Sequence, residues 1–285
     1  MESPGANTEK AQEIRERVKH IKTLPTLSGV VKKLCKVMES ETVSTQEIAE
    51  IIGTDQVLTA RVLKIVNSPF YGFPGRISTI NHALVLLGLN VIKGIVLSAA
   101  VIDNMEKSIG GLWEHSLGVA TATNRIAQSI GLPEPEEIST AGLLHDLGKV
   151  ILSSEMPAEC EQVLREVEES GISFMEAEKK LLEGITHPKI AGWLAADWNL
   201  PPRLKDPMVF HHHPGMSKLA PKPTAVVHLA NILTRSLQFG DGGDPYIPKI
   251  SPVALKTLDL RLADLAGYLD MIADELEGID TSDFN

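Results

Sequence analysis

Aromatic residues and cysteine are scarce in this sequence, and strand-like patterns are rare. Only 4% of the residues are aromatic, and strict alternation of apolar and polar residues is hard to find over the length of a strand. The two cysteines, Cys35 and Cys160, lie in separate segments without a CxxC motif. They exclude a disulfide framework and a four-cysteine zinc site, and they favour a reducing cytoplasm.

Positively charged residues are also fewer than negatively charged ones. The chain has 27 Lys and Arg residues against 37 Asp and Glu residues, which gives a formal net charge of −10. Broad binding to nucleic acid or to an anionic membrane needs a concentrated basic surface, so we expect neither partner. Small anionic ligands remain compatible with this charge, because a metal ion or a few local cations can outweigh it.

Targeting and membrane signals are lacking as well. The first residues show no basic segment followed by an apolar one, so we expect no signal peptide. The longest apolar stretch, Ala83 to Ile102, carries Asn90 and Lys93 near its middle, and a central Lys costs about 2.5–3.5 kcal/mol on membrane insertion. Gly88 instead indicates a junction between two buried helices. We therefore expect a soluble, cytoplasmic protein.

Helical periodicity is what the sequence does have. Apolar residues recur three or four positions apart almost throughout, and Ser44–Glu47 and Ser173–Glu176 match the capping box that starts a helix. The 43% hydrophobic fraction is enough to build a core without disulfides. These features predict an all-α fold.

Two interruptions divide the chain, one near 104–111 and a second, rich in Gly and Asp, over 240–245. We expect a tail and a leading helix over 1–20 and an N-terminal helical subdomain over 21–108. A second helical subdomain is expected over 109–240, and a linker with C-terminal helices over 241–285. The composition of 240–245 predicts a flexible connection.

Histidines are concentrated in the second subdomain, which holds seven of the nine. His145 is followed directly by Asp146 after an apolar run, and near a helix end this pair can converge on one ion. Burying both groups without a partner would be costly. We interpret the isolated His82 and His228 as hydrogen-bonded core residues.

A metal centre is the hypothesis that these histidines support. His115, His187 and the His211–His212 pair lie on three separate predicted helices, and a helical bundle can hold metal with ligands from several helices. Imidazole and carboxylate ligands suit Fe, Mn, Zn or Ni better than Ca or Mg. We expect one or two such divalent ions. The residues indicate no particular oligomeric state.

Several segments together resemble the HDOD family, the HD-related output domains of bacterial signalling proteins, within the HD superfamily of metal-dependent phosphohydrolases. The resemblance covers roughly residues 21–237 and rests on these segments: Leu24–Leu27, Ile51–Thr59, Val66–Gly72, Ile77–Ala83, Leu86–Gly88, His145–Asp146, Trp198–Pro201, His211–His212 and His228–Asn231. It implies an N-terminal helical bundle packed on an HD-type helical subdomain.

The resemblance also implies roles for single residues. His115, His145 and Asp146 match the first metal ligands of the superfamily, and His187, His211 and His212 match further ligands of its cyclic-dinucleotide phosphodiesterase branch. Lys149 matches a lysine close to the scissile phosphate in that branch, and would be catalytic only in an active enzyme.

Two departures bear on activity. Asn231 occupies the position at which the superfamily has Asp as its last metal ligand, so Asn231 would be at most a weak or vestigial ligand. His213–Ser217 follows the His pair without the Glu and the Gly-Tyr-Pro loop of the phosphodiesterase branch. The resemblance therefore implies a signalling output module that binds a protein partner or a nucleotide-like effector without efficient catalysis.

Two alternatives remain open. One is an active metal-dependent phosphohydrolase acting on a nucleotide or a cyclic dinucleotide, and the other is a scaffold whose histidines only form hydrogen bonds. The aromatic connection Asn67–Gly75 could offer a docking surface. We favour the interpretation that Phe70 and Tyr71 instead cap the junction between the two subdomains.

Overall fold

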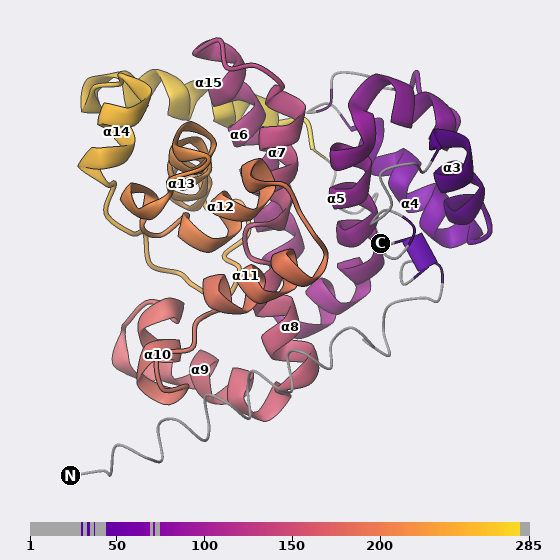
Figure 1. The fold of residues 1–285 in the computed structure, drawn as a ribbon. Coiled ribbons are helices and arrows are strands. Elements are labelled where there is room, and N and C mark those ends of the chain that lie inside the picture. The colour runs from indigo at the N-terminus through magenta and orange to yellow at the C-terminus, as the bar shows by residue number, and fades with distance from the viewer. Residues whose placement is uncertain are drawn as a thin grey trace.

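The computed structural model describes residues 30, 33, 34, 37, 44–68, 71 and 75–279, with the backbone alone over 101–108. The described residues form helices joined mostly by short loops, with a longer connection over 237–251, and no strand occurs among them (Figure 1). The predicted all-α fold is confirmed. The predictions for 1–20 and the Leu24–Leu27 segment lie outside the described residues. The helices are α3 (Thr45–Gly53), α4 (Gln56–Val66), α5 (Ile80–Ser108), α6 (Leu112–Ser129), α7 (Pro135–Leu144), α8 (Leu147–Glu155), α9 (Pro157–Ser170), α10 (Phe174–Leu181), α11 (His187–Asp197), α12 (Pro202–Phe210), α13 (Pro221–Ser236), α14 (Pro252–Leu258) and α15 (Leu265–Glu277), with 3-10 turns η3 (Pro214–Met216) and η4 (Leu262–Asp264).

Side-chain caps fix several helix starts. Ser44 accepts a hydrogen bond from the Glu47 amide at the start of α3. Before α10, the Ser173 hydroxyl accepts from the Glu176 amide while the Glu176 carboxylate accepts from the Ser173 amide, which completes a capping box. Both starts lie where the sequence predicts them.

The long apolar helix α5 is bent at Gly88, whose φ of 78° and ψ of 169° leave the helical range. This is the junction that the sequence predicts, and glycine tolerates the positive φ. By length and composition Ile80–Ala100 could cross a membrane, but 61% of its most apolar window is buried inside the protein. Asn90 beyond the bend donates to the buried Glu137 carboxylate of α7. These contacts are typical of a core helix in a soluble domain.

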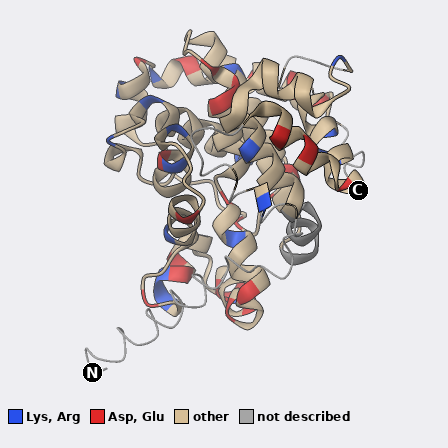
Figure 2. Ribbon diagram, turned by 45° about the vertical axis from the view of Figure 1, so that its right-hand side comes forward, with Lys and Arg blue, Asp and Glu red and all other residues tan. Residues whose placement is uncertain are grey.

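The centre of the molecule is built around α6. This helix packs against α7 and α13, while α11 and α12 lie beside α8 and α13 and complete the surroundings of the site (Figure 1). Helices α3, α4 and α5 form the N-terminal bundle, which meets α7 and α8 through α5. One hydrophobic core extends from Leu34 to Leu276 through all these helices. Figure 2 shows Lys and Arg interspersed with Asp and Glu along the described helices.

Tyr71 ties the N-terminal bundle to the central helices. Its side chain is buried, and its hydroxyl lies 2.9 Å from the Thr140 hydroxyl of α7. The Asn67 amide holds the same connection by donating to the Ile77 carbonyl and accepting from the Ile77 amide. These contacts support the junction interpretation for Tyr71; Phe70 lies outside the described residues.

Candidate metal centre

The His145–Asp146 pair lies at a break between two helices. Helix α7 ends at Leu144 and α8 begins at Leu147, so the pair forms the whole connection. Gly148 in the first turn of α8 allows α11 to approach closely, because a Cβ on Gly148 would lie 2.0 Å from the His187 carbonyl oxygen. Packing of α8 on α11 therefore brings His187, the first residue of α11, next to Asp146.

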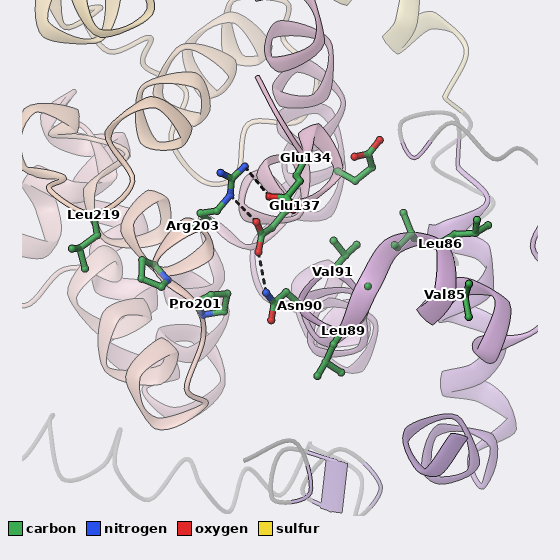
Figure 3. Close-up of a pocket in the computed structure, with 14 residues that line it drawn as sticks. Val85, Leu86, Leu89, Asn90, Val91, Glu134, Glu137, Pro201, Arg203 and Leu219 are labelled. Carbon is green, nitrogen blue, oxygen red and sulfur yellow. Dashed lines mark hydrogen bonds and ion pairs between the residues drawn. The ribbon is translucent and has the colours of Figure 1, made fainter. Parts of the chain in front are cut away.

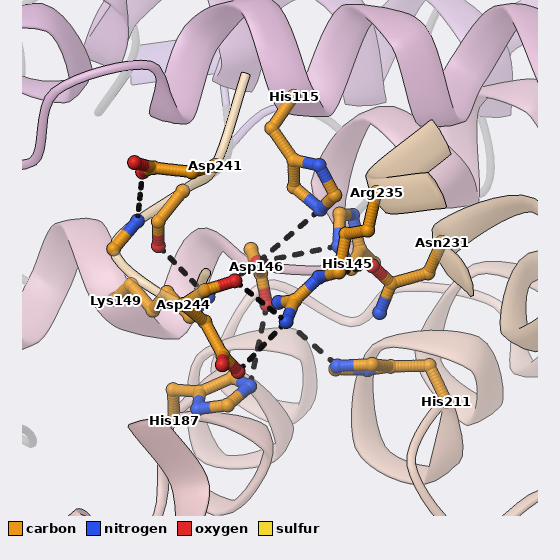
Figure 4. A network of polar contacts seen from close by, with 12 residues as sticks. His115, His145, Asp146, Lys149, His187, His211, Asn231, Arg235, Asp241 and Asp244 are labelled. Carbon is orange, nitrogen blue, oxygen red and sulfur yellow. Dashed lines mark hydrogen bonds and ion pairs between the residues drawn. The ribbon is translucent and has the colours of Figure 1, made fainter. Parts of the chain in front are cut away.

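Four imidazoles surround the Asp146 carboxylate (Figure 4). The Nε2 atoms of His187 and His211 lie 3.2 and 3.6 Å from Asp146 Oδ1, and those of His145 and His115 lie 3.3 and 3.9 Å from Oδ2. All five side chains are fully buried. They come from α6, the α7–α8 connection, α11 and the end of α12, as the sequence predicts for a shared site.

Hydrogen bonds on the far side of two rings turn their free nitrogens toward this point. His145 Nδ1 lies 2.7 Å from the Gly142 carbonyl oxygen, and His211 Nδ1 lies 3.2 Å from the Pro207 carbonyl oxygen. Because a carbonyl only accepts, Nδ1 carries the proton in both rings and Nε2 presents a lone pair. Such supporting contacts orient histidine ligands in metal sites.

Glu178 orients a third histidine, and the sequence analysis missed it. Its buried carboxylate accepts from the His187 amide at 2.7 Å and lies 2.7 Å from His187 Nδ1. Burial alone would lower the pKa of His187, but the negative charges of Glu178 and Asp146 outweigh it and raise that pKa. Nothing in the spacing of Glu178, which lies on α10, distinguishes it from the exposed acidic residues nearby.

Several nitrogens at the centre have no hydrogen-bond partner among the described residues. They are both ring nitrogens of His115 and the Nε2 atoms of His145 and His211. Buried polar atoms are rarely left unpaired, and a cation would satisfy lone pairs that converge on one point. The ligand atoms of His115, His145 and Asp146 all lie within 4.8 Å of one another. The residues therefore fit a divalent transition ion.

A second group of possible ligands lies next to the first. The ligand atoms of His187, His211 and His212 also lie within 4.8 Å of one another, and His212 Nε2 is 3.1 Å from His187 Nε2. His212 is half-buried, unlike the other ligands. From this second group His187 and His211 face the Asp146 carboxylate, as His115 and His145 do from the first, and His187 also contacts Glu178.

The electrostatics keep most of these histidines neutral. Burial, followed by the charge of Arg235, lowers the pKa of His115, while burial and neighbouring histidines lower the pKa of His211 and His212. Burial would raise the pKa of Asp146, but His145 and Lys149 outweigh it and hold that pKa well below its usual range. Neutral imidazole and ionised carboxylate are the metal-binding forms.

Lys149 and Asn231 lie at the edge of this cluster with their polar atoms engaged. Lys149 is fully buried, and its Nζ lies 2.8 Å from Asp146 Oδ2 and 3.0 Å from the Gly242 carbonyl oxygen. The Asn231 side-chain oxygen accepts a hydrogen bond from Arg235 Nε at 3.1 Å. Arg235 and the loop that carries Gly242 are further parts of the site that the sequence analysis missed.

The two histidines interpreted as core residues, His228 and His82, differ in their surroundings. His228 is a hydrogen-bonded core residue, as interpreted from the sequence: its Nδ1 donates to the His211 carbonyl, and its Nε2 accepts from the Ser251 amide. The same interpretation is wrong for His82, which is exposed at the start of α5. The position of a histidine beside apolar residues in the sequence does not show whether its own side of the helix is buried.

A separate groove of about 750 Å³ lies between the bend of α5 and the N-terminal ends of α7 and α12 (Figure 3). Arg203 lines it, with its guanidinium 2.7 Å from the Glu137 carboxylate. Val85 and Leu219 line it and are 76% and 73% exposed. None of the lining residues belongs to the histidine cluster, so the groove gives no direct access to it.

Known proteins share this architecture. A crystal structure of an HDOD domain protein of unknown function from Geobacter sulfurreducens is 27% identical, with a TM-score of 0.68 over 98% of this chain and 100% of that chain. A protein from Shewanella amazonensis SB2B, whose name assigns it provisionally to the phosphohydrolases, is 24% identical, with a TM-score of 0.63 over 92% of this chain and 96% of that one. The second likeness shows the fold alone.

Sequence comparison gives the family. An uncharacterized protein of Treponema pallidum (strain Nichols) is 27% identical over 261 residues, which cover 84% of this chain but only 46% of that protein. This chain thus spans about half the length of that relative. The model of the HDOD domain matches residues 24–214, which include all six predicted ligand positions: His115, His145, Asp146, His187, His211 and His212. The chain belongs to the HDOD domain family.

Proposed function

We propose that this protein is a signalling output module in which an HD-type centre holds a divalent transition metal, and that it acts by binding rather than by efficient catalysis. Membership of the HDOD family supports the signalling role. The observation that carries the metal is the convergence of unpartnered buried nitrogens from His115, His145 and His211 on Asp146.

The donor set identifies the ligands and the type of ion. His115, His145 and Asp146 would hold one ion, and His187, His211 and His212 could hold a second. Nitrogen and carboxylate donors favour Fe, Mn, Zn or Ni. When bound, the ion supplies positive charge and Lewis acidity next to Lys149 for an anionic ligand.

The hydrogen bonds and the burial of the residues around the site support binding over catalysis. Asn231 gives its side-chain oxygen to Arg235, and it offers no negative charge at a position where a carboxylate would help to hold metal. The ligand side chains other than His212 are fully buried, so a substrate would reach most of them only after surrounding residues move. The expected partner is a signalling protein or a nucleotide-like effector.

Metal analysis tests the proposal. We expect untagged protein to retain near-stoichiometric transition metal and a His145→Ala/Asp146→Ala variant to retain little. The matched control is His82→Ala/Asp270→Ala, which removes the same two residue types from exposed positions and should keep the wild-type metal content. Equal, negligible metal in all three proteins would contradict the proposal and favour a scaffold whose histidines only form hydrogen bonds.

An active phosphohydrolase is the second candidate, favoured by the placement of Lys149 against Asp146 in a nearly complete ligand set. The test is a screen of metal-loaded protein against cyclic dinucleotides and nucleoside phosphates. Turnover that disappears in Asp146→Ala would establish this candidate over the binding module, whereas an inert panel would count against it.

A further inference from the structure

The segment Gly240–Tyr246, which includes the stretch 240–245 that composition predicts to be flexible, lies close against the site. A Cβ on Gly240 would lie 2.4 Å from the His115 amide nitrogen, and one on Gly242 would lie 3.2 Å from the His115 ring. The φ angles of both glycines are positive. Within the segment, the Asp244 amide donates to the Asp241 carbonyl. Only a glycine-rich backbone can lie this close to α6 and its histidine.

This segment supplies the partners of two buried cations. The Gly242 carbonyl accepts from Lys149 Nζ at 3.0 Å. The Asp244 carboxylate lies 2.8 Å from an Arg235 nitrogen, which also donates to the carbonyls of Asp244 and Tyr246. Arg235 is 5% exposed and Asp244 is 2% exposed. The segment therefore covers the cationic side of the centre with its own oxygens.

The pairing of Arg235 with Asp244 is incomplete. The second terminal nitrogen of the guanidinium and the second oxygen of the carboxylate are both buried without a hydrogen-bond partner. A guanidinium can bind a carboxylate or a phosphate through two parallel hydrogen bonds, and only one of its terminal nitrogens is used here. Asp244 thus satisfies fewer of the hydrogen-bond donors of Arg235 than a larger tetrahedral anion could.

The location of Arg235 joins this pair to the histidine cluster. Figure 4 shows its guanidinium among the ligand side chains, with Asn231 on one side and Asp244 and Lys149 on the other. Lys149 is also the partner of Asp146 at 2.8 Å. Two buried cations on one side of a histidine centre are a suitable receptor for the negative charge of a ligand.

We propose that Arg235 and Lys149 form a binding site for a phosphoryl group, which Asp244 and the Gly242 carbonyl fill as an internal substitute. A phosphoryl ligand binds when the segment Gly240–Tyr246 moves away, which frees Arg235 from Asp244 and Lys149 from the Gly242 carbonyl while Lys149 keeps its contact with Asp146. The inference deepens the proposed function, on which its biological meaning rests, by naming the ligand chemistry and the element that controls access.

Inorganic phosphate is the probe, titrated by calorimetry into protein stripped of metal with EDTA. In Asp244→Asn, which keeps the shape of the side chain but removes its charge, we expect phosphate to bind at least tenfold more tightly than in wild type. Asp241→Asn, the same change at an exposed position of the same segment, keeps an oxygen that can accept from the Gly243 amide and should resemble wild type. Adding Arg235→Gln to Asp244→Asn should abolish the gain. An affinity of Asp244→Asn within twofold of wild type, or a gain that survives Arg235→Gln, would overturn the proposal.

Hydrogen exchange of the unmodified protein gives a second measurement that does not depend on how well the variants fold. Phosphate should speed exchange of the Gly242–Asp244 amides relative to chloride at equal ionic strength, while the amides of α9 and α10 stay unchanged. Unchanged exchange at Gly242–Asp244 would overturn the proposal. Because both measurements use metal-free protein, absence of metal from the purified protein would contradict only the proposed function.

Discussion

Replacement of Gly148 by Ala tests how the helices position the metal ligands. The new Cβ would lie 2.0 Å from the His187 carbonyl oxygen and 2.7 Å from its carbonyl carbon, whereas ordinary contact begins at 3.4 Å. Both obstructing atoms belong to the backbone, so α8 and α11 must separate by more than 1 Å. Overpacking typically costs about 1–3 kcal/mol, and a rigid backbone obstacle places this variant near or above the upper end, at about 3 kcal/mol.

The assay is urea denaturation of metal-free protein, followed by metal analysis of the purified variant. We expect Gly148→Ala to lose about 3 kcal/mol of unfolding free energy and most of its metal, because separation of α8 from α11 displaces Asp146, which directly precedes α8, as well as His187. Gly53→Ala is the control, since its Cβ would meet nothing within 4 Å and Ala favours a helix. A loss below about 1 kcal/mol together with full metal content would refute the packing argument.

Two further predictions concern the support and titration of the ligands. Glu178→Gln should weaken metal binding by about 10- to 100-fold, which is the usual effect of removing a partner that orients a histidine ligand. Glu169→Gln, the same change at an exposed position, should leave the affinity unchanged. Equal metal affinities of Glu178→Gln and wild type would exclude the role of Glu178. The lowered pKa values of His115, His211 and His212 mean that, below pH 6.5, the unfolded chain takes up protons that the folded metal-free protein does not. Its unfolding free energy should therefore fall between pH 6.5 and 5.5, by up to about 1.4 kcal/mol per pH unit for each of these three histidines, offset in part by His187, whose raised pKa acts with the opposite sign. Urea denaturation that shows constant or rising stability on acidification would contradict this sign.

Much of the fold was predictable because local signals agree with it. The Gly88 bend follows from glycine before a second apolar run, and the α10 start follows from a capping box whose partners lie three residues apart. The cluster around Asp146 was likewise predictable, since its histidines fall near helix ends in one part of the chain. Their roles as metal ligands stay a prediction.

The supporting residues could not be predicted from the sequence. Glu178 reaches His187 only because α10 packs beside the start of α11, and acidic residues on an amphipathic helix are ordinarily solvated. The composition of Gly240–Tyr246 is that of a linker, yet its glycines serve close approach to His115. Whether such a stretch is a free linker or packs against the site depends on the tertiary contact between Asp244 and Arg235, which no local sequence pattern encodes.

The most direct test of the central claim is an anomalous difference map from crystals of the untagged protein, recorded above the absorption edges of Fe, Mn, Zn and Ni. The account predicts a peak bonded to His115, His145 and Asp146, at about 2.0–2.2 Å from their ligand atoms. A map without a peak, in which ordered water or direct hydrogen bonds satisfy the same nitrogens, would contradict it.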